Sequence, residues 1–160
     1  MTVVLSLKSK KAIDQWLKKF PTDQKQSGVL FALRTVQAEN GGWLSEVLMD
    51  AVAAYLGMPN IAVYEVATFY SMFDLKPVGK HKICVCTNIA CLLRGSDEIL
   101  NQIKTELGIE VGETTRDGRF TLKAVECLAA CGGAPMMQIG GKVYENLTPE
   151  KINPILAELE

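Results

Sequence analysis

The sequence predicts an α+β protein, in which an N-terminal helical bundle is followed by an α/β domain with a mixed sheet. Through residue 77 of the 160, apolar side chains recur at helical spacing, and glycine or proline separates the periodic stretches. From residue 78 onward, extended stretches and helical periodicity follow in the order strand, helix, three strands and helix. We therefore expect a helical domain over 1–77 and an α/β domain over 78–160, joined at the Lys-Pro-Val-Gly stretch of residues 76–79.

Four helices are expected in the first domain, over residues 5–20, 22–39, 46–56 and 61–73. Pro21 ends the first helix, an Asn-Gly-Gly run breaks the second at residues 40–42, and Ser45 caps the third. The fourth segment carries aromatic side chains that we interpret mainly as core filling: Tyr64, Phe69, Tyr70 and Phe73.

The first strand of the second domain is expected from His81 to just before Cys86. Because successive side chains alternate, Ile83 and Val85 share one face, and Cys84 lies on the face of Cys86. We expect Cys84 to pack in the core rather than to bind metal, since it sits one pleat back from the strand end. His81, the single histidine, lies at the far end of this strand and is expected to be exposed to solvent.

Turn and cap signals define the rest of the second domain. The expected elements are a helix over 91–107, extended pieces over 113–115 and 119–126 around an Asp-Gly turn, a hairpin over 136–144 and a final helix to residue 159. Thr148 and Pro149 suit the start of that helix, because proline is favoured at the first helical position. This order suits a mixed sheet with helices packed against it.

Composition excludes several classes of function. With 17 basic and 18 acidic residues, the chain has no electrostatic footprint for nucleic acid. No apolar run reaches the roughly 18–20 residues of a membrane span, and the first residues do not form a secretory leader, so we expect a soluble cytoplasmic protein. No G-x-G-x-x-G or P-loop follows a strand, so no NADH site is expected on this chain. Five cysteines, an odd number, indicate metal ligands and one buried thiol rather than a disulfide framework.

Two cysteine pairs supply the thiols for one metal centre. Cys86 and Cys91 have C-x4-C spacing, and Cys127 and Cys131 have C-x3-C spacing. Both iron–sulfur clusters and structural zinc accept four thiolates, so the spacing alone leaves the metal open. The small residues that flank the pairs, Thr-Asn at 87–88 and Gly-Gly at 132–133, favour a cluster, because they allow backbone N–H groups and close approach to the sulfurs.

These motifs resemble the thioredoxin-like [2Fe–2S] ferredoxin family. The residues that carry the resemblance are Cys-Thr-Asn at 86–88, Leu-Arg-Gly at 93–95, Glu-Cys-Leu at 126–128 and Cys-Gly-Gly-Ala-Pro at 131–135, with Gly-Trp-Leu at 42–44 and Val-Ala-Thr-Phe-Tyr-Ser-Met-Phe at 66–73 upstream. The resemblance implies a thioredoxin-like fold and one [2Fe–2S] cluster held by Cys86, Cys91, Cys127 and Cys131.

The resemblance also implies a place in a respiratory chain. The chain is then an electron-transfer subunit of an NADH–quinone oxidoreductase, peripheral to the inner membrane, and its cluster accepts an electron from FMN. FMN and NADH are bound by a partner subunit, onto which the helical domain over 1–77 docks. Other subunits of the peripheral arm are further partners.

Three alternatives remain open. The same cluster motifs occur in the diaphorase subunits of NAD-linked hydrogenases and formate dehydrogenases. A thiol–disulfide oxidoreductase is a second alternative, although neither cysteine pair has the C-x-x-C spacing that such enzymes use. A zinc-stabilised interaction module is the third.

Overall fold

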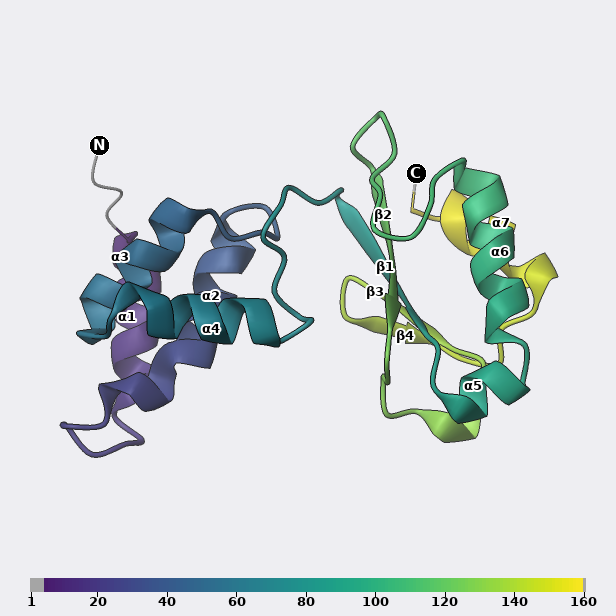
Figure 1. Cartoon of the computed structure of the whole chain (residues 1–160). Coiled ribbons are helices and arrows are strands. Elements are labelled where there is room, and N and C mark those ends of the chain that lie inside the picture. The colour runs from purple at the N-terminus through teal and green to yellow at the C-terminus, as the bar shows by residue number, and fades with distance from the viewer. Residues whose placement is uncertain (1–4, 160) are drawn as a thin grey trace. The chain divides into compact units, whose positions relative to one another are not determined.

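The computed structural model describes residues 5–159, which form two compact units with a boundary between Pro77 and Val78 (Figure 1). Each unit has a hydrophobic core of its own. Helices alone make the first unit, whereas helices and a four-stranded mixed sheet make the second. The expected α+β fold class is therefore confirmed.

The helical unit follows the expected order with two differences in its boundaries. Its elements are α1 Leu7–Leu17, the 3-10 helix η1 Lys25–Gly28, α2 Val29–Glu39, α3 Glu46–Leu56 and α4 Asn60–Phe69. The second helix begins later than expected, because a 3-10 turn precedes it. The fourth ends earlier, because Tyr70 adopts an extended conformation with φ −87° and ψ 120°.

Each helix contributes a fully buried aliphatic side chain to one core: Ile13, Leu33, Val52 and Val63. The aromatic residues of the fourth segment divide between core and surface. Phe73 is buried, whereas Phe69 is 80% exposed and Tyr70 38% exposed. The expectation of core filling is wrong for Phe69 and Tyr70: Phe69 is the last residue of α4 and has no covering element, and Tyr70 lies beyond the helix in an extended conformation.

The second unit is a mixed sheet with helices. Its elements are β1 His81–Cys86, α5 Ile89–Leu93, α6 Ser96–Leu107, β2 Phe120–Val125, the 3-10 helix η2 Cys131–Gly133, β3 Met137–Ile139, β4 Lys142–Tyr144 and α7 Pro149–Ala157. The strand order is β2-β1-β3-β4, with β1 and β2 parallel and the other two pairs antiparallel. The single helix expected over 91–107 is two helices, because Gly95 adopts a left-handed φ of 90° and redirects the chain between them.

One face of this sheet is packed against α6 and α7, which lie on the same side of it (Figure 1). Ile83 and Val85 point into this core, as their alternation predicts. Cys84 lies on the other face, level with Lys123 and Gln138 on the neighbouring strands, and is half-buried. The expectation that Cys84 packs in the core is therefore wrong, because α6 and α7 cover the opposite face.

His81 also differs from its expectation. Its ring is half-buried and lies 5.6 Å from the ring of Phe120, measured between centroids. Burial lowers the pKa of His81, and the neighbouring cations Lys80 and Arg119 lower it further. His81 is thus a packed side chain at the start of β1, remote from the cysteines that follow the strand.

Among the helices of residues 5–159, none is long and apolar enough to cross a membrane.

The start of α3 yields a stability prediction. Ser45 Oγ accepts a hydrogen bond from the N–H of Leu48 at 3.3 Å and so satisfies a free donor of the first turn. We expect Ser45→Ala to lower the free energy of unfolding by about 1 kcal/mol, and Ser45→Gly by only a few tenths, roughly. Urea unfolding followed by circular dichroism measures both. Equal effects of the two substitutions would contradict a capping role.

Candidate metal centre

Strand pairing brings the two cysteine loops to one end of the sheet. β1 ends at Cys86, and Cys86 pairs with Val125 on the parallel strand β2, so Cys127 lies two residues beyond the same end. Cys91 lies on α5, directly after the first loop, and Cys131 begins η2 in the second loop. Figure 1 shows α5 and the segment after β2 at this same end of the sheet. The four expected ligands are thus close in space, although the two pairs are far apart in sequence.

Backbone hydrogen bonds join the two loops to each other. The N–H of Thr87 donates to the carbonyl of Val125 at 3.0 Å, and the N–H of Cys86 donates to the carbonyl of Met136 at 3.2 Å. Arg94 adds a side-chain bond, from Nη1 to the carbonyl of Ala134 at 3.2 Å. The loops are therefore held by three independent bonds that do not involve sulfur.

The four thiols differ sharply in exposure. Cys86 and Cys91 are 3% and 2% exposed and pack with Met136 in a small apolar cluster beneath the loops. Cys127 and Cys131 are exposed. A centre bound by these four sulfurs has one buried side and one side at the protein surface.

The pKa values of the two buried thiols move in opposite directions. Burial alone would raise the pKa of Cys86, but hydrogen bonds from the N–H groups of Asn88 and Leu128, followed by contacts with the Cys91 and Cys127 thiols, bring it below its ordinary value. Burial raises the pKa of Cys91, and its hydrogen bond with Cys86 raises it further. Because metals bind the thiolate, Cys86 is the better prepared of the two buried candidate ligands to give up its proton.

Backbone N–H groups donate to the sulfurs of Cys86, Cys91 and Cys127, and such donors are among the groups that set the potential of an iron–sulfur cluster. Beyond the two donors to Cys86, the N–H of Ala129 donates to Cys127 Sγ at 3.3 Å, and Met136 donates to Cys91. Ala129 adopts a left-handed φ of 59°, which is uncommon for a residue with a Cβ. The sequence offered no signal for the donors at 128 and 129, because neither residue is of a type that favours this conformation.

The glycine pair has a different role from the expected one. The expectation was that Gly132 and Gly133 allow backbone N–H groups and close approach to the sulfurs, and neither of them is in the left-handed region. The N–H of Gly133 donates instead to the carbonyl of Ala130 at 3.0 Å. A Cβ at Gly133 would lie 2.5–2.7 Å from side-chain atoms of Glu145, whereas a Cβ at Gly132 would meet open space. Gly133 is thus required for close packing against Glu145.

The donor set fits an iron–sulfur cluster. Four cysteine thiols are the ligands of a [2Fe–2S] centre, and N–H donors to sulfur are among the groups that set its potential. Within residues 5–159, no three His, Cys, Asp or Glu side chains form a group ready to hold a metal ion. The match between this site and a [2Fe–2S] cluster therefore depends on the four thiols and their N–H partners, and not on side chains already placed around a metal position. Cys84, two residues before Cys86 on β1, lies one pleat back from the loops.

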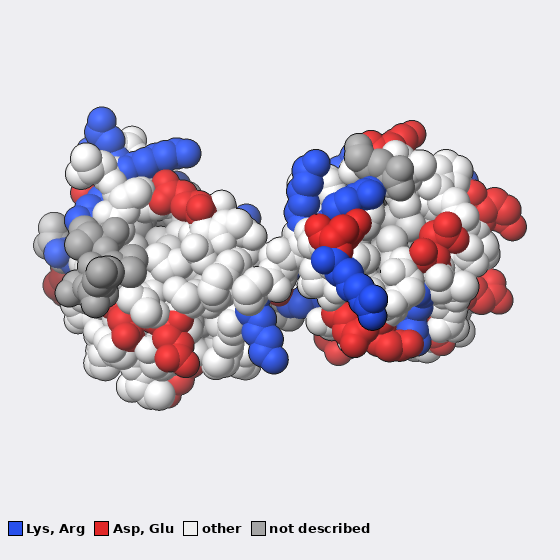
Figure 2. Space-filling model, turned by 90° about the horizontal axis from the view of Figure 1, so that it is seen from above, with Lys and Arg blue, Asp and Glu red and all other residues white. Residues whose placement is uncertain are grey.

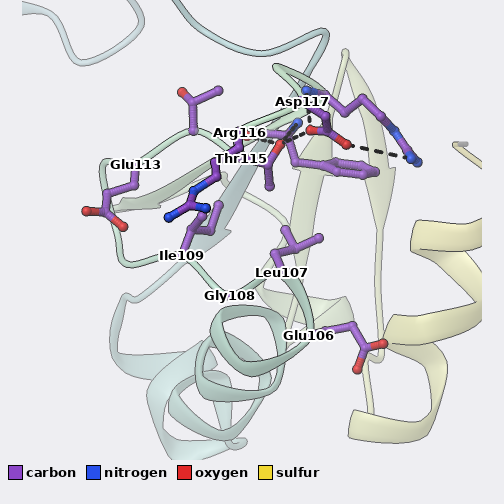
Figure 3. A pocket seen from close by; sticks show the side chains of 11 residues that line it. Glu106, Leu107, Gly108, Ile109, Glu113, Thr115, Arg116 and Asp117 are labelled. Carbon is purple, nitrogen blue, oxygen red and sulfur yellow. Dashed lines mark hydrogen bonds and ion pairs between the residues drawn. The ribbon is translucent and has the colours of Figure 1, made fainter.

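A cavity of about 900 Å³ lies at the opposite end of the sheet, where α6 and the 114–119 turn meet. Figure 3 shows that charged side chains line it, among them Glu113, Arg116 and Asp117. Asp117 is engaged in its own turn: the Thr115 hydroxyl and the Arg119 N–H donate to it, and these bonds, the first above all, lower its pKa. The cavity contains no cysteine and is separate from the candidate centre.

Comparison with known proteins bears out the resemblance. Residues 13–160 match the family model of the thioredoxin-like [2Fe–2S] ferredoxin. The E subunit of NADH-quinone oxidoreductase from Rickettsia bellii (strain RML369-C) is 50% identical over 143 residues, which cover 89% of this chain and 86% of that protein. The corresponding protein of Rickettsia conorii (strain ATCC VR-613 / Malish 7) is 47% identical over 147 residues, covering 92% of this chain and 88% of that protein. The mitochondrial NADH dehydrogenase [ubiquinone] flavoprotein 2 of Dictyostelium discoideum is 44% identical over 148 residues, 92% of this chain and 60% of that protein.

A solved structure supports the fold. A chain of the NAD+-reducing [NiFe]-hydrogenase in its air-oxidized state superposes with a TM-score of 0.70 at 19% sequence identity. The match covers 82% of this chain and 22% of the hydrogenase chain, so this chain spans about a fifth of that protein. With the family match, this likeness confirms the thioredoxin-like fold that the resemblance implied.

The glycine pair provides a matched test of the loop. We expect Gly133→Ala to lower the free energy of unfolding by about 1–3 kcal/mol, because its Cβ collides with Glu145. Gly132→Ala should change it by less than about 0.5 kcal/mol, because its Cβ points into open space. Urea unfolding of each variant measures the difference. Adding Glu145→Gly to Gly133→Ala should restore part of the loss; no restoration would contradict the collision.

Proposed function

Because the chain belongs to the thioredoxin-like [2Fe–2S] ferredoxin family, we propose that it holds one [2Fe–2S] cluster on the thiolates of Cys86, Cys91, Cys127 and Cys131. The observation that carries the proposal is the meeting of both cysteine loops at one sheet end, with N–H groups directed at their sulfurs. When bound, such a cluster supplies one-electron oxidation and reduction. The chain is then an electron carrier, and the assembly to which it belongs is the enzyme.

The protein's own groups set how easily the centre accepts an electron. Reduction adds negative charge near the sulfurs, and N–H donors from Asn88, Leu128 and Ala129 are already oriented to stabilise it. If these donors favour the reduced state by about 1.4 kcal/mol, the one-electron potential rises by about 59 mV. Met136, fully buried beneath the loops, excludes water from the inner side.

The partner that delivers the electron is, in this proposal, a subunit that binds FMN and NADH. The support is the naming of the relatives, which are NADH-quinone oxidoreductase subunits in Rickettsia and an NADH dehydrogenase flavoprotein in Dictyostelium. This chain carries no dinucleotide motif, so the flavin and nucleotide belong to the partner. Other peripheral-arm subunits then pass the electron on toward quinone, and the chain works on the cytoplasmic side at the periphery of the inner membrane.

The helical unit serves, we propose, mainly for docking onto that partner. All five cysteines lie between positions 84 and 131, so this unit contributes no sulfur ligand. It has a hydrophobic core of its own, formed by α1 to α4 and the segments beside them, with Leu33 and Val52 fully buried. A compact unit with its own core and no sulfur ligand is suited to a structural role in the assembly.

A diaphorase subunit of an NAD-linked hydrogenase or formate dehydrogenase is the second candidate in the same class. The fold neighbour is part of an NAD+-reducing hydrogenase, but its chain is far longer and only 19% identical. The Rickettsia proteins match at about half identity over nearly their full length, which favours the respiratory host. Zinc modules and thiol–disulfide oxidoreductases are less well supported, since the family is defined by its [2Fe–2S] cluster and the chain has no C-x-x-C motif.

Metal analysis tests the proposal directly. The purified protein is expected to be red-brown and to contain two irons and two acid-labile sulfides per chain, because four thiolates complete the coordination of two irons. Its midpoint potential should lie toward roughly −400 mV rather than in the Rieske range, since no histidine lies among the ligands. One zinc with no iron would refute the cluster, and a midpoint above zero would refute an all-cysteine ligand set.

Cys84 and Cys86 form a matched pair for the ligand assignment. We expect Cys86→Ser to lose or badly destabilise the cluster, because Cys86 is the buried ligand with N–H support. Cys84→Ala should keep the cluster and cost about 1 kcal/mol of stability or less, because Cys84 is only half-buried. Visible absorption and electron paramagnetic resonance spectra report the cluster in each variant. Loss in the Cys84 variant with survival in the Cys86 variant would reverse the assignment.

A further inference from the structure

Arg94 connects the two loops of the candidate centre from the end of α5. Its backbone N–H donates to the carbonyl of Cys91 at 3.1 Å, and its side chain donates from Nη1 to the carbonyl of Ala134 at 3.2 Å. Ala134 is only 2% exposed, so water has little access to the carbonyl that the guanidinium contacts. Arg94 is therefore bonded at both ends, by its backbone to a candidate ligand and by its side chain to the segment that follows the second cysteine pair.

The segment from Ala134 to Met136 contacts three of the four candidate ligands through its backbone. The N–H of Ala134 donates to the carbonyl of Cys131 at 3.3 Å. The N–H of Met136 donates to the Cys91 thiol, and its carbonyl accepts from the N–H of Cys86 at 3.2 Å. A displacement of this segment therefore changes the surroundings of three candidate ligands together.

Arg94 also brings a positive charge to a part of the chain that has none of its own. Residues 86–93 and 127–137 contain no Asp, Glu, Lys or Arg, although 22% of the chain is charged. Glu126, which is exposed, lies directly outside the second of these segments. Arginine stays protonated in proteins, so its charge is permanent. Neither segment supplies a carboxylate that would offset the field of the guanidinium.

The opposite end of the same unit carries a matched arginine in a different setting. Figure 2 looks onto the end with the 114–119 turn, and residues of both charge signs gather over it. Arg116 belongs to this turn, is exposed as Arg94 is, and lines the cavity there together with Glu113 and Asp117. Removal of Arg116 changes the net charge by the same amount as removal of Arg94, but at a place remote from the cysteines.

We propose that Arg94 is a positioning residue for the centre, which holds the segment from Ala134 to Met136 against α5 and, through its charge, makes the centre easier to reduce. This inference rests on the function proposed above, because it concerns the uptake of an electron by the cysteine site. Ala134 packs in one apolar cluster with Cys86 and Cys91, so a group bonded to its carbonyl lies close to both thiols.

The charge acts on the reduced state more than on the oxidised one. Reduction places one additional electron at the end of the sheet to which the guanidinium is bonded, and no bond within the chain is made or broken. A fixed positive charge nearby lowers the free energy of that added negative charge. The guanidinium keeps its proton throughout, so the effect is electrostatic and does not involve proton transfer.

The test uses three substitutions at one position. Arg94→Lys keeps the charge, Arg94→Gln keeps an N–H donor without the charge, and Arg94→Met removes both. Midpoint potentials of the purified cluster-containing chains are measured by titration with dithionite, followed by electron paramagnetic resonance. We expect the equilibrium constant for reduction to fall about threefold to tenfold in Arg94→Gln and Arg94→Met, which corresponds to about 28–59 mV. In Arg94→Lys, and in the control Arg116→Gln, it should change by less than about twofold.

Two further measurements separate the charge from the hydrogen bond. The difference in potential between wild type and Arg94→Gln should fall by at least about half between about 50 mM and about 500 mM salt, because salt screens an exposed guanidinium. A change in loop structure alone would not respond to salt in this way. Release of iron to a chelator should be at least about threefold faster in Arg94→Met than in Arg94→Lys, because the lysine ammonium can still donate to the carbonyl of Ala134.

Several outcomes would overturn the role of Arg94. They are a wild-type potential in Arg94→Gln, an equal fall in Arg116→Gln, a fall that persists at high salt, or equal rates of iron release from Arg94→Met and Arg94→Lys. If Arg94→Met does not retain iron at all, the potentials of Arg94→Lys and Arg94→Gln decide, and equal values in these two overturn the charge effect. A wild-type chain without iron overturns the proposed function, whereas iron-containing variants with wild-type potentials overturn the role of Arg94 alone.

Discussion

The parallel pairing of β1 with β2 is the contact on which the candidate centre depends. It sets Cys86 opposite Val125, and this register determines that both cysteine loops begin at the same end of the sheet. A slip by one residue would reverse the faces of a whole strand and turn Cys86 into the helix-covered core. The aliphatic face formed by Ile83 and Leu122 holds the register, because both are fully buried against α6 and α7. The chemistry at the end of the sheet is thus fixed by apolar packing along its length.

The site combines two environments that a single loop cannot provide. On the inner side, Cys86 and Cys91 lie among apolar residues, where charge is costly unless N–H groups stabilise it. On the outer side, Cys127 and Cys131 reach the surface, where a partner can approach. The buried pair lies at the end of β1 and on α5. The exposed pair lies on either side of a turn in which Ala129 has a left-handed conformation. Stability on one side and accessibility on the other are properties that an electron carrier needs together.

Sequence reasoning succeeded where local chemistry and fold agree. Ser45 and Gly57 bound α3 as their types predict, since one accepts a first-turn N–H and the other takes the left-handed φ at the end. The alternation in β1 correctly separated Ile83 and Val85 from the cysteines. The cysteine spacing identified the two loops, which the structure brings to one sheet end.

Sequence reasoning failed where tertiary contacts decide. Position 133 requires glycine because the side chain of Glu145, a residue of another segment, occupies the space that a Cβ would need. Phe69 and Cys84 have apolar or adaptable side chains whose burial depends on which face receives a covering helix. The donors around the sulfurs come from ordinary residues at 128 and 129, so their role exists only in the folded loop. Composition and periodicity carry no information about such contacts.

The parallel connection between β1 and β2 also orders events during biosynthesis. Cys86 and Cys91 leave the ribosome before β2 and the loop with Cys127 and Cys131 have been made. Because a parallel pair needs a long crossover, β1 can pair with β2 only after the segment between them, which includes α6, has been made. Until then, the first pair of thiols has no second pair with which to bind a shared metal centre. All four candidate ligands are therefore present only after translation has passed Cys131, and a nascent chain arrested within α6 carries thiols that oxidants can attack.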